Sequence, residues 1–364
     1  MAHVKSLLFA LQKIMSTKAS SNPNKPSEKP PTPVPVTILT GFLGAGKTTL
    51  LNRILKEDHG LRIAVIENEF GQEGVDNEIL SNTTEQIVEM NNGCICCTVR
   101  GDLIRILGDL RRKRDKGQLK FDRVVIETTG MADPGPVAQT FFVDEKTNTY
   151  YLLDAIITVM DAKHGDEQLN RFKEAQEQIG FADRVLLSKT DLVEPQSVDK
   201  LKARIAQMNP RASIGQVHFG VAPIKEILDI RGFNLNAVLN IDPSFLEEKA
   251  HDHSDDIGSF VIKTERALDV KKIDRFISSL IDLYGQDMLR YKGILNIHGE
   301  PRRVIFQGVH MMAGFDFGQE WGDTPKSSTL VFIGRKLPQA LFRELFDECY
   351  ADASSSDPYE AVKA

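Results

Sequence analysis

Short apolar runs alternate with longer amphipathic segments through the first two thirds of the chain. The runs are rich in Val, Ile and Leu, as the buried strands of a parallel sheet are. The segments between them repeat apolar residues at helical spacing. Strands that alternate with such helices indicate βαβ units and a mostly parallel sheet covered on both faces. The predicted strands are 36–40, 62–68, 86–90, 121–130, 152–162, 182–192 and 213–219, and the predicted helices are 41–57, 99–117, 165–179 and 198–210.

The pattern changes after a polar stretch at 245–256. Apolar runs that predict strands and amphipathic segments that predict helices follow it, in the arrangement typical of a small α+β domain on a mostly antiparallel sheet. The strands are 257–265, 289–297, 302–312 and 328–337, and the helices are 269–284 and 338–350. The sequence therefore predicts an α/β domain at 36–240, a polar linker at 241–256, a smaller α+β domain at 257–350 and a disordered tail at 351–364.

The first 35 residues are predicted to form a disordered arm. Residues 1–20 are basic and contain no acidic side chain, and the Pro/Ser/Lys tract at 21–35 cannot build a packed core. The residues leave two alternatives open for this arm. It could be a mitochondrial-type targeting sequence, or an extension from an early start codon with Met15 as the true start.

Composition narrows the class of protein. The 364 residues carry 45 Lys and Arg against 51 Asp and Glu, a net charge of −6, which gives no electrostatic attraction to nucleic acid or an anionic membrane. No apolar run reaches the roughly 18 residues that span a bilayer. Four cysteines do not make a disulfide framework, so we expect a reducing, cytoplasmic environment. Cys349 lies in an apolar helical segment and is expected to be a small buried side chain.

The stretch GFLGAGKT at 41–48 matches the pattern G-x-x-x-x-G-K-[ST] between a predicted strand and a predicted helix. Gly41 and Gly46 let backbone N–H groups turn toward phosphate oxygens, and the helix N-terminus adds partial positive charge. We expect Lys47 to reach the β- and γ-phosphates and the Thr48 hydroxyl to bind Mg²⁺. The stretch therefore predicts a site for a nucleoside triphosphate.

Two acidic residues end strands at the same predicted edge of the sheet. Glu127 ends an apolar run, and Gly130 follows three residues later. We predict that Glu127 holds Mg²⁺ or its bound water, and that the Gly130 backbone senses the γ-phosphate. Glu67 ends another run and is a second candidate metal ligand at this rim. A solvated carboxylate at a strand end is the alternative for each acid.

The stretch SKTD at 188–191 follows a strand and has the form of the [N/S/T]KxD signature of GTP-binding folds. Asp191 would accept hydrogen bonds from guanine N1–H and the 2-amino group, whereas adenine would leave its carboxylate unpaired. Lys189 would lie along the base and ribose. Ser188 stands where Asn is common, and an ordinary turn with Asp191 as a helix N-cap is the alternative.

Cys94, Cys96 and Cys97 lie within four residues of one another. Thiolates are soft ligands that suit Zn²⁺ or Cu(I), and neighbours in a C-x-C-C run cannot bridge one another without strain. Three thiolates with an open fourth position can bind a metal and also release it. A redox-sensing group of thiols or a structural turn is the alternative.

In their order and spacing, GFLGAGKTTLLNRIL, IENEFG, NGCICC, ETTGMADPGP and SKTDL resemble the CobW-type GTPases. These are metal-handling relatives of the hydrogenase and urease nickel chaperones. The match is nearest to the branch that holds the YjiA-like proteins and the zinc-regulated GTPase metalloprotein activators. The resemblance implies a P-loop GTPase domain and a smaller CobW-type C-terminal domain.

The resemblance also implies slow GTP hydrolysis coupled to delivery of a divalent metal to a client metalloprotein. Zinc is the expected metal, with cobalt or nickel as alternatives, and a homodimer is left open. The residues that it assigns to phosphate binding are Gly41, Gly44, Ala45, Gly46, Lys47, Thr48 and Thr49. It assigns the metal thiolates to Cys94, Cys96 and Cys97, places Glu67 and Glu127 beside the switch segments, and assigns guanine to Ser188, Lys189 and Asp191.

Two other functions stay open at this point. A zinc buffer or sensor would use its GTP site only for regulation, and an ATPase of the same fold would not use Asp191 to select the base. No residue stands out as the one that orients the attacking water, so we expect slow intrinsic turnover that a partner could raise.

Overall fold

The computed structural model describes residues 33–57, 59–67, 87–89, 97–221, 227–228, 230, 256–352 and 355. The chain divides into two compact units, a larger one mainly at 32–234 and a smaller one mainly at 257–364. Most of the predicted arm and linker lies outside the described residues, as do Cys94 and Cys96. The domain limits given above stay predictions.

Within the described residues, the larger unit contains a seven-stranded sheet in which every neighbouring pair is parallel. Its strands are β1 (Val34–Thr40), β2 (Ile63–Glu67), β3 (Ile87–Glu89), β4 (Arg123–Glu127), β5 (Tyr151–Asp161), β6 (Arg184–Ser188) and β7 (Ser213–Val217). Their order is β3-β2-β4-β1-β5-β6-β7. Since all the strands run the same way, their carboxyl ends meet at one edge, where ligands bind in such sheets. The predicted parallel sheet is confirmed.

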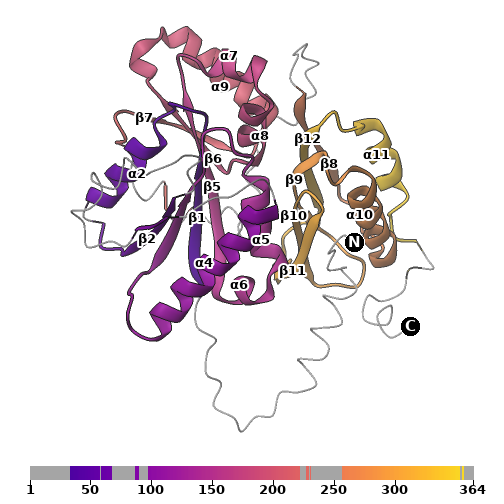
Figure 1. Ribbon diagram of the computed structural model, residues 1–364. Helices are drawn as coiled ribbons and strands as arrows, with labels where there is room; N and C mark the ends of the chain where they lie inside the picture. Colours follow the sequence, from indigo (N-terminus) through magenta and orange to yellow (C-terminus); the bar gives the residue numbers. More distant parts are fainter. Residues whose placement is uncertain are drawn as a thin grey trace. The chain divides into compact units, whose positions relative to one another are not determined.

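Helices cover both faces of this sheet. They are α2 (Lys47–Lys56), α4 (Cys97–Asp115), α5 (Gly135–Val143), α6 (Glu145–Tyr150), α7 (Gly165–Arg171), α8 (Lys173–Phe181) and α9 (Pro195–Met208). Leu50 and Ile54 of α2 pack against Leu39 and Ile157 of the sheet. The connections β1–α2–β2 and β3–α4–β4 cross the sheet in opposite directions, so right-handed crossovers place α2 and α4 on opposite faces. Figure 1 shows α4, α5 and α6 grouped side by side.

Helix α4 runs antiparallel to the strands. Tyr151, the first residue of β5, donates its hydroxyl to the Leu107 carbonyl oxygen at 2.9 Å, which places the middle of α4 beside the amino edge of the sheet. Cys97 begins the helix ten residues before Leu107, about 15 Å along the axis at 1.5 Å per residue. The start of α4 therefore lies toward the carboxyl edge.

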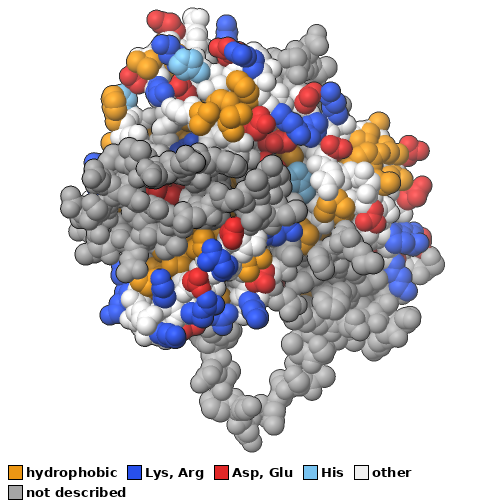
Figure 2. All heavy atoms as spheres, in the orientation of Figure 1, with side chains coloured by type: hydrophobic (Ala, Val, Ile, Leu, Met, Phe, Trp, Pro, Cys, Tyr) orange, Lys and Arg blue, Asp and Glu red, His pale blue; other side chains and the backbone are white. Residues whose placement is uncertain are grey.

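The far end of α4 is strongly charged. Figure 2 shows Lys and Arg side chains gathered over this part of the surface. Arg105 and Arg112 both pair with Asp109, and Arg111 pairs with Asp115, all within the helix and all partly exposed. Such pairs stabilise a helix by only a few tenths of a kcal/mol each, about 0.2–0.5. The basic end of α4 is therefore a solvent-exposed helix end, remote from the carboxyl edge of the sheet.

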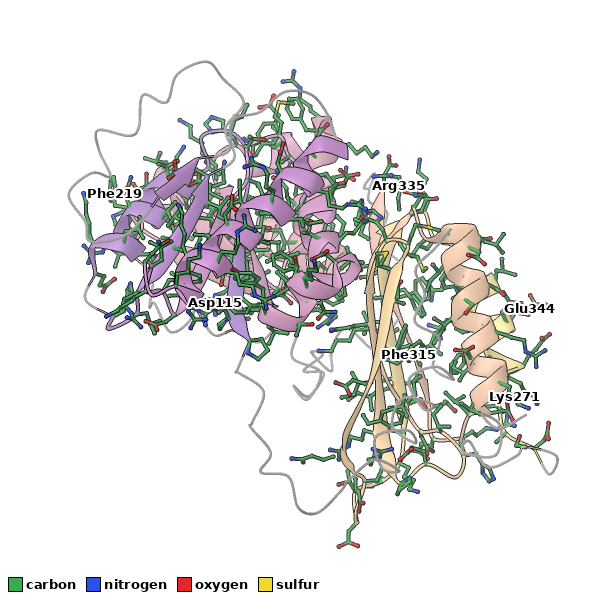
Figure 3. The ribbon with its side chains drawn as sticks, turned by 60° about the horizontal axis from the view of Figure 1, so that its bottom comes forward. Asp115, Phe219, Lys271, Phe315, Arg335 and Glu344 are labelled. Atoms are coloured by element: carbon green, nitrogen blue, oxygen red, sulfur yellow. The ribbon has the colours of Figure 1, made fainter. Side chains whose placement is uncertain are left out.

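The smaller unit has, among its described residues, a five-stranded antiparallel sheet ordered β11-β10-β9-β12-β8. Its elements are β8 (Ile257–Thr264), α10 (Val270–Tyr284), β9 (Met288–Leu295), β10 (Arg302–Val309), β11 (Met312–Glu320), β12 (Ser328–Arg335) and α11 (Gln339–Asp347). Figures 1 and 3 show α10 and α11 on one face of the sheet, and Ile273, Ile277 and Phe346 from these helices join Phe332 of β12 in one core. Cys349 is buried at 2% exposure in this core, as predicted.

Three parts of the secondary structure prediction are wrong. Segment 165–179 forms two helices because Phe172 is extended and its ring lies against Phe42. Helices α5 and α6 are missing from the prediction because Pro134 and Pro136 give the segment the look of a loop. The run 302–312 is not one strand, since a turn with left-handed backbone at His310 separates β10 from the additional strand β11.

Every helix in the described part of the chain is too short or too polar to span a bilayer.

Candidate nucleotide and metal site

The loop between β1 and α2 depends on glycine. Gly41, Gly44 and Gly46 have φ values of 143°, 71° and 100°, a region that other residues rarely adopt. A Cβ at Gly41 would also collide with the carbonyl oxygen of Val159 in the neighbouring strand β5. The predicted phosphate loop is therefore held in a conformation that requires glycine at its start, and it leads directly into the N-terminus of α2.

Lys47 is folded into this loop. Its Nζ donates to the Gly41 carbonyl oxygen at 2.9 Å and to that of Phe42 at 3.3 Å. Burial lowers the pKa of Lys47 below its ordinary value, and the negative charge of Glu127 partly offsets the effect. An ammonium group drawn out of bulk water and surrounded by backbone carbonyls is placed to exchange those acceptors for phosphate oxygens.

Thr48 and Glu127 come together although 79 residues separate them. The Thr48 hydroxyl donates to Glu127 Oε1 at 3.1 Å. Glu67 is the register partner of Glu127 on the adjacent strand β2, so both carboxylates stand at the carboxyl edge. A hydroxyl and two carboxylates are hard oxygen ligands of the kind that Mg²⁺ takes. The residues at this edge therefore fit a magnesium ion bound beside the phosphate loop.

Gly130 packs directly against the phosphate loop. A Cβ at this position would lie 2.7 Å from the Leu43 backbone nitrogen and 2.8 Å from Leu43 Cα. The buried side chain of Gln178 in α8 holds the same segment, since its Nε2 donates to the carbonyl oxygens of Gly130 at 3.2 Å and Ala132 at 3.1 Å. The segment after β4 is thus fixed on both sides, against the loop and against α8.

The residues assigned to the base also bind the phosphate loop. The Ser188 hydroxyl donates to the Ala45 carbonyl oxygen at 2.7 Å, and Lys189 Nζ donates to that of Gly44 at 2.8 Å. Ser188 ends β6, two strands from β1, so these contacts join the two binding loops across β5. Ser188, at the position where Asn is common, therefore makes a side-chain contact to the phosphate loop.

Asp161 is a site residue that the sequence analysis missed. It ends β5, and its Oδ2 accepts from Lys189 Nζ at 2.7 Å and from His164 Nδ1 at 3.0 Å. Burial alone would raise the pKa of Asp161, but the hydrogen bonds from Lys189, His164 and the Lys163 N–H outweigh it and lower the pKa. The sequence did contain a signal for Asp161, an acidic residue at the end of β5. This strand lies between β1 and β6, which lead into the phosphate loop and the SKTD stretch.

Asp191 lies in the short 3₁₀ turn Thr190–Leu192 and is partly exposed. Its Oδ1 is 3.5 Å from Nδ1 of His218, which directly follows β7. Thr49, the last predicted phosphate-loop residue, meets the same region, because a Cβ at Gly220 would lie 2.7 Å from the Thr49 carbonyl oxygen. The turn after β7 therefore borders both Asp191 and the first turn of α2.

The cysteine run is described only at its end. Cys97 begins α4, while Cys94, Cys96 and the Cys97 side chain lie outside the description. Among the described residues, no group of three His, Cys, Asp or Glu side chains is arranged to hold a metal ion. In the first turn of α4, Arg100 Nη2 donates to Gln139 Oε1 of α5 at 3.1 Å. Helix α4 is thus tied to the helix that follows the Gly130 segment.

A parallel α/β sheet with a glycine-dependent loop, a buried lysine and a Thr–Glu pair at its carboxyl edge defines a P-loop nucleotide-binding protein. The family description "CobW/HypB/UreG, nucleotide-binding domain" matches residues 35–216. The description "Cobalamin synthesis protein cobW C-terminal domain" matches residues 257–350. The chain belongs to the CobW/HypB/UreG family, and both the family prediction and the two-part fold prediction are confirmed.

Relatives support this assignment over most of the chain. The chain is 45% identical over 315 residues to the zinc chaperone YjiA of Escherichia coli, which covers 86% of this chain and 98% of YjiA. It is 39% identical over 318 residues to zinc-regulated GTPase metalloprotein activator 1 of Schizosaccharomyces pombe, which covers 76% of this chain and 75% of that protein. The crystal structure of Zn(II)-bound YjiA GTPase from E. coli matches with a TM-score of 0.73 at 40% identity, over 88% of this chain and all of that chain.

Proposed function

We propose that this chain is a GTP-hydrolysing metallochaperone, which binds zinc through Cys94, Cys96 and Cys97 and delivers it to a client metalloprotein. The observation that carries the proposal is that the candidate nucleotide site and the start of α4 lie toward the same edge of the sheet. The Thr48–Glu127 pair lies at the carboxyl edge of the sheet, and α4, which begins at the last of the three cysteines, starts toward that same edge. The relatives named as zinc chaperones and GTPases support the same function.

The proposed nucleotide chemistry uses residues that already face one another. Lys47 would bind the β- and γ-phosphates, and the Thr48 hydroxyl and the carboxylates of Glu127 and Glu67 would hold Mg²⁺ directly or through water. Bound Mg²⁺ would supply positive charge against the charge that develops on the transferred phosphoryl group. The Gly130 backbone would contact the γ-phosphate side of the site. We propose that hydrolysis without a partner is slow, because no residue stands out in the sequence as the one that orients the attacking water.

Asp191 is proposed to select guanine. Its carboxylate would accept from guanine N1–H and the 2-amino group, and Lys189 would lie along the base. Lys189 is held by Asp161 and by Gly44, so its position is fixed before a base arrives. The substitution Asp191→Asn should favour xanthine over guanine nucleotides, because the amide can donate where xanthine offers a carbonyl oxygen.

Zinc is proposed as cargo rather than as a resident ion. Three soft thiolates bind Zn²⁺ well and leave a position for a ligand of the client. Helix α4 offers a route between metal and nucleotide, from Cys97 through Arg100 to Gln139 of α5 and back to the Gly130 segment. If GTP changes the affinity for zinc, zinc must change the affinity for GTP by the same factor. Thiolate ligands need a reducing compartment, for which we propose the cytoplasm.

The test compares metal transfer in wild type and Cys94→Ser/Cys96→Ser/Cys97→Ser. Zinc-loaded protein is mixed with a chelating acceptor peptide, in GDP or in a non-hydrolysable GTP analogue, and the transfer rate is followed with a zinc dye. We expect nucleotide-dependent transfer in wild type and loss of stoichiometric zinc in the triple variant. Transfer at one rate in every nucleotide state would contradict the chaperone function and favour a buffer.

Coupling is tested by GTP-analogue affinity with and without Zn²⁺. Arg100→Ala should reduce the difference between the two affinities. Arg105→Ala is the matched control, because Arg105 lies on the same helix, is 65% exposed and, among the described residues, forms its ion pairs with Asp102 and Asp109 of α4. Equal GTP-analogue affinity with and without zinc in wild type would refute the coupling.

A further inference from the structure

The four residues that follow β7, His218 to Val221, form a tight turn with an exposed aromatic ring at its tip. The Val221 N–H donates to the His218 carbonyl oxygen at 2.9 Å, and the two central residues both have left-handed backbone, with φ of 46° at Phe219 and 77° at Gly220. Turns of this kind favour Asn, Asp or Gly at the first central position. Phe219 is an unfavourable residue there, and its side chain gains little burial, since it is 77% exposed.

The turn lies beside the proposed guanine site. Strand β7 pairs with β6 and Val217 is the register partner of Ser188, so His218 and Lys189 leave the sheet side by side. The imidazole of His218 lies 3.5 Å from Asp191 on one side and makes an edge-to-face contact with Phe219 on the other, at 4.6 Å between ring centroids. Gly220 closes the turn against the Thr49 carbonyl oxygen of α2. Figure 3 shows Phe219 at the periphery of the larger unit.

These contacts give the turn a fixed place without burying its tip. Gly220 against α2 and His218 against Asp191 anchor it on both sides of Phe219. The Phe219 ring is 77% exposed, so its packing does little to offset the cost of its left-handed backbone. It lies beside the carboxylate that we propose selects the base. Strained backbone held by its surroundings is typical of binding sites. An aromatic face next to a hydrogen-bonding edge is the arrangement that binds a planar base.

We propose that the Phe219 ring stacks on the purine held by Asp191, so that the base lies between Phe219 and the aliphatic part of Lys189. This inference rests on the proposed function and adds a base-stacking residue to it. Stacking on an aromatic ring strengthens binding of any purine, because every purine has the same kind of π face. Phe219 would therefore set affinity, while Asp191 sets the choice of base.

The test measures dissociation constants for GDP, GTP analogue, IDP and XDP by calorimetry. Phe219→Ala should weaken binding of all four by a similar factor, roughly 5- to 150-fold for one stacked base. Phe219→Tyr and Phe219→Trp should retain binding. Phe219→Trp should also change fluorescence when GDP binds, and wild type, with its single tryptophan buried at position 321, should not.

Phe219→Asn separates folding from binding. Asn suits the left-handed backbone, so this variant should unfold at the same or a higher temperature than wild type and still lose nucleotide affinity. Leu283→Ala is the control for removal of an exposed apolar side chain, since Leu283 is 71% exposed on α10 of the other unit. It should bind nucleotides as wild type does.

The outcomes distinguish this inference from the function beneath it. If wild type binds guanine nucleotides and Phe219→Ala binds them equally well, the stacking role is refuted and the proposed function stands. If Phe219→Ala alters the preference among bases, as Asp191→Asn should, the ring acts in selection and the stacking role is again refuted. If wild type binds no guanine nucleotide, the proposed function fails and this inference fails with it.

Discussion

Gly130→Ala tests whether the segment after β4 and the phosphate loop are one packed unit. The added Cβ would lie 2.6 Å from Leu43 Cδ2, 2.7 Å from its backbone nitrogen and 2.8 Å from its Cα. Ordinary carbon contacts are about 3.5–4.0 Å, so Cα alone would have to retreat by about 0.7 Å. Two of the three atoms belong to the backbone, so a side-chain rotation cannot relieve the clash. Overpacking of this kind costs about 1–3 kcal/mol.

The strain should appear in stability and in nucleotide choice. A loss of about 1–3 kcal/mol corresponds to a fall of about 2–12 °C in the unfolding temperature of the larger unit. The GTP analogue should lose more affinity than GDP, because we propose that the Gly130 backbone contacts the γ-phosphate side of the site, and each tenfold difference corresponds to about 1.4 kcal/mol.

The matched control for this prediction is Gly108→Ala. Gly108 lies inside α4, and within the described part of the chain a Cβ there meets only the Arg112 guanidinium, at an ordinary 3.6 Å. Removing a helical glycine should stabilise the protein by up to about 1 kcal/mol. Thermal unfolding followed by circular dichroism, and calorimetry with GDP and GTP analogue, make the comparison. A Gly130→Ala protein with the wild-type unfolding temperature and the wild-type GTP/GDP preference would show that this segment moves freely past Leu43, and the reasoning would be refuted.

Two further predictions concern buried titratable groups. Burial raises the pKa of the Cys349 thiol to about 12, so at pH 8 only about one thiol in 10⁴ is the reactive thiolate, against roughly a quarter for an ordinary cysteine. In Cys94→Ser/Cys96→Ser/Cys97→Ser, iodoacetamide should therefore label Cys349 about 10³-fold more slowly in the folded protein than in urea, and comparable rates would contradict its burial. Asp161→Asn removes the charged acceptor of Lys189 and should cost about 1.5–3 kcal/mol of unfolding free energy at pH 7. Because the pKa of Asp161 is lowered by folding, this stabilisation is full above about pH 4 and is lost at lower pH, so urea titrations of the two proteins should converge there.

The strands of the larger unit could be predicted from the sequence because both faces of a parallel sheet are covered. Runs such as VVI before Glu127 are apolar at every position, and turn residues mark their ends. Helices α5 and α6 could not be predicted in the same way. Their segment contains Pro134 and Pro136, and Asp144 caps α6 through the Thr147 N–H, a contact that only the folded chain reveals. Strand β11 was missed since its outer residues are polar, as suits an edge strand.

Glu67 and Glu127 were predicted as site residues from their places at strand ends, and Asp161 was missed although it ends β5. Gln178 and Phe219 have no such place. Thr48 and Glu127 could be assigned to one site from the sequence. The loop before Thr48 follows one strand, Glu127 ends another, and parallel strands end at the same edge of the sheet. Gln178 lies inside a helix and gave no signal, although its amide binds two backbone carbonyls of the Gly130 segment. Phe219 gave none either, since its interest comes from its backbone conformation and its exposure rather than from a motif.

The order of the strands places the proposed base-binding residues and the proposed metal site on opposite sides of the nucleotide. The proposed base contacts lie on the β6 and β7 side of the central strand β1, whereas β3, which leads to the cysteine run, lies on the opposite flank beyond β2 and β4. Strands are about 4.8 Å apart, so β3 is about 14 Å from β1 and about 24 Å from β6. A metal bound near the start of α4 would therefore lie closer to Glu67, Glu127 and the proposed phosphate site than to Asp191. Zinc bound there would act on the difference between GTP and GDP and leave the choice of base unchanged.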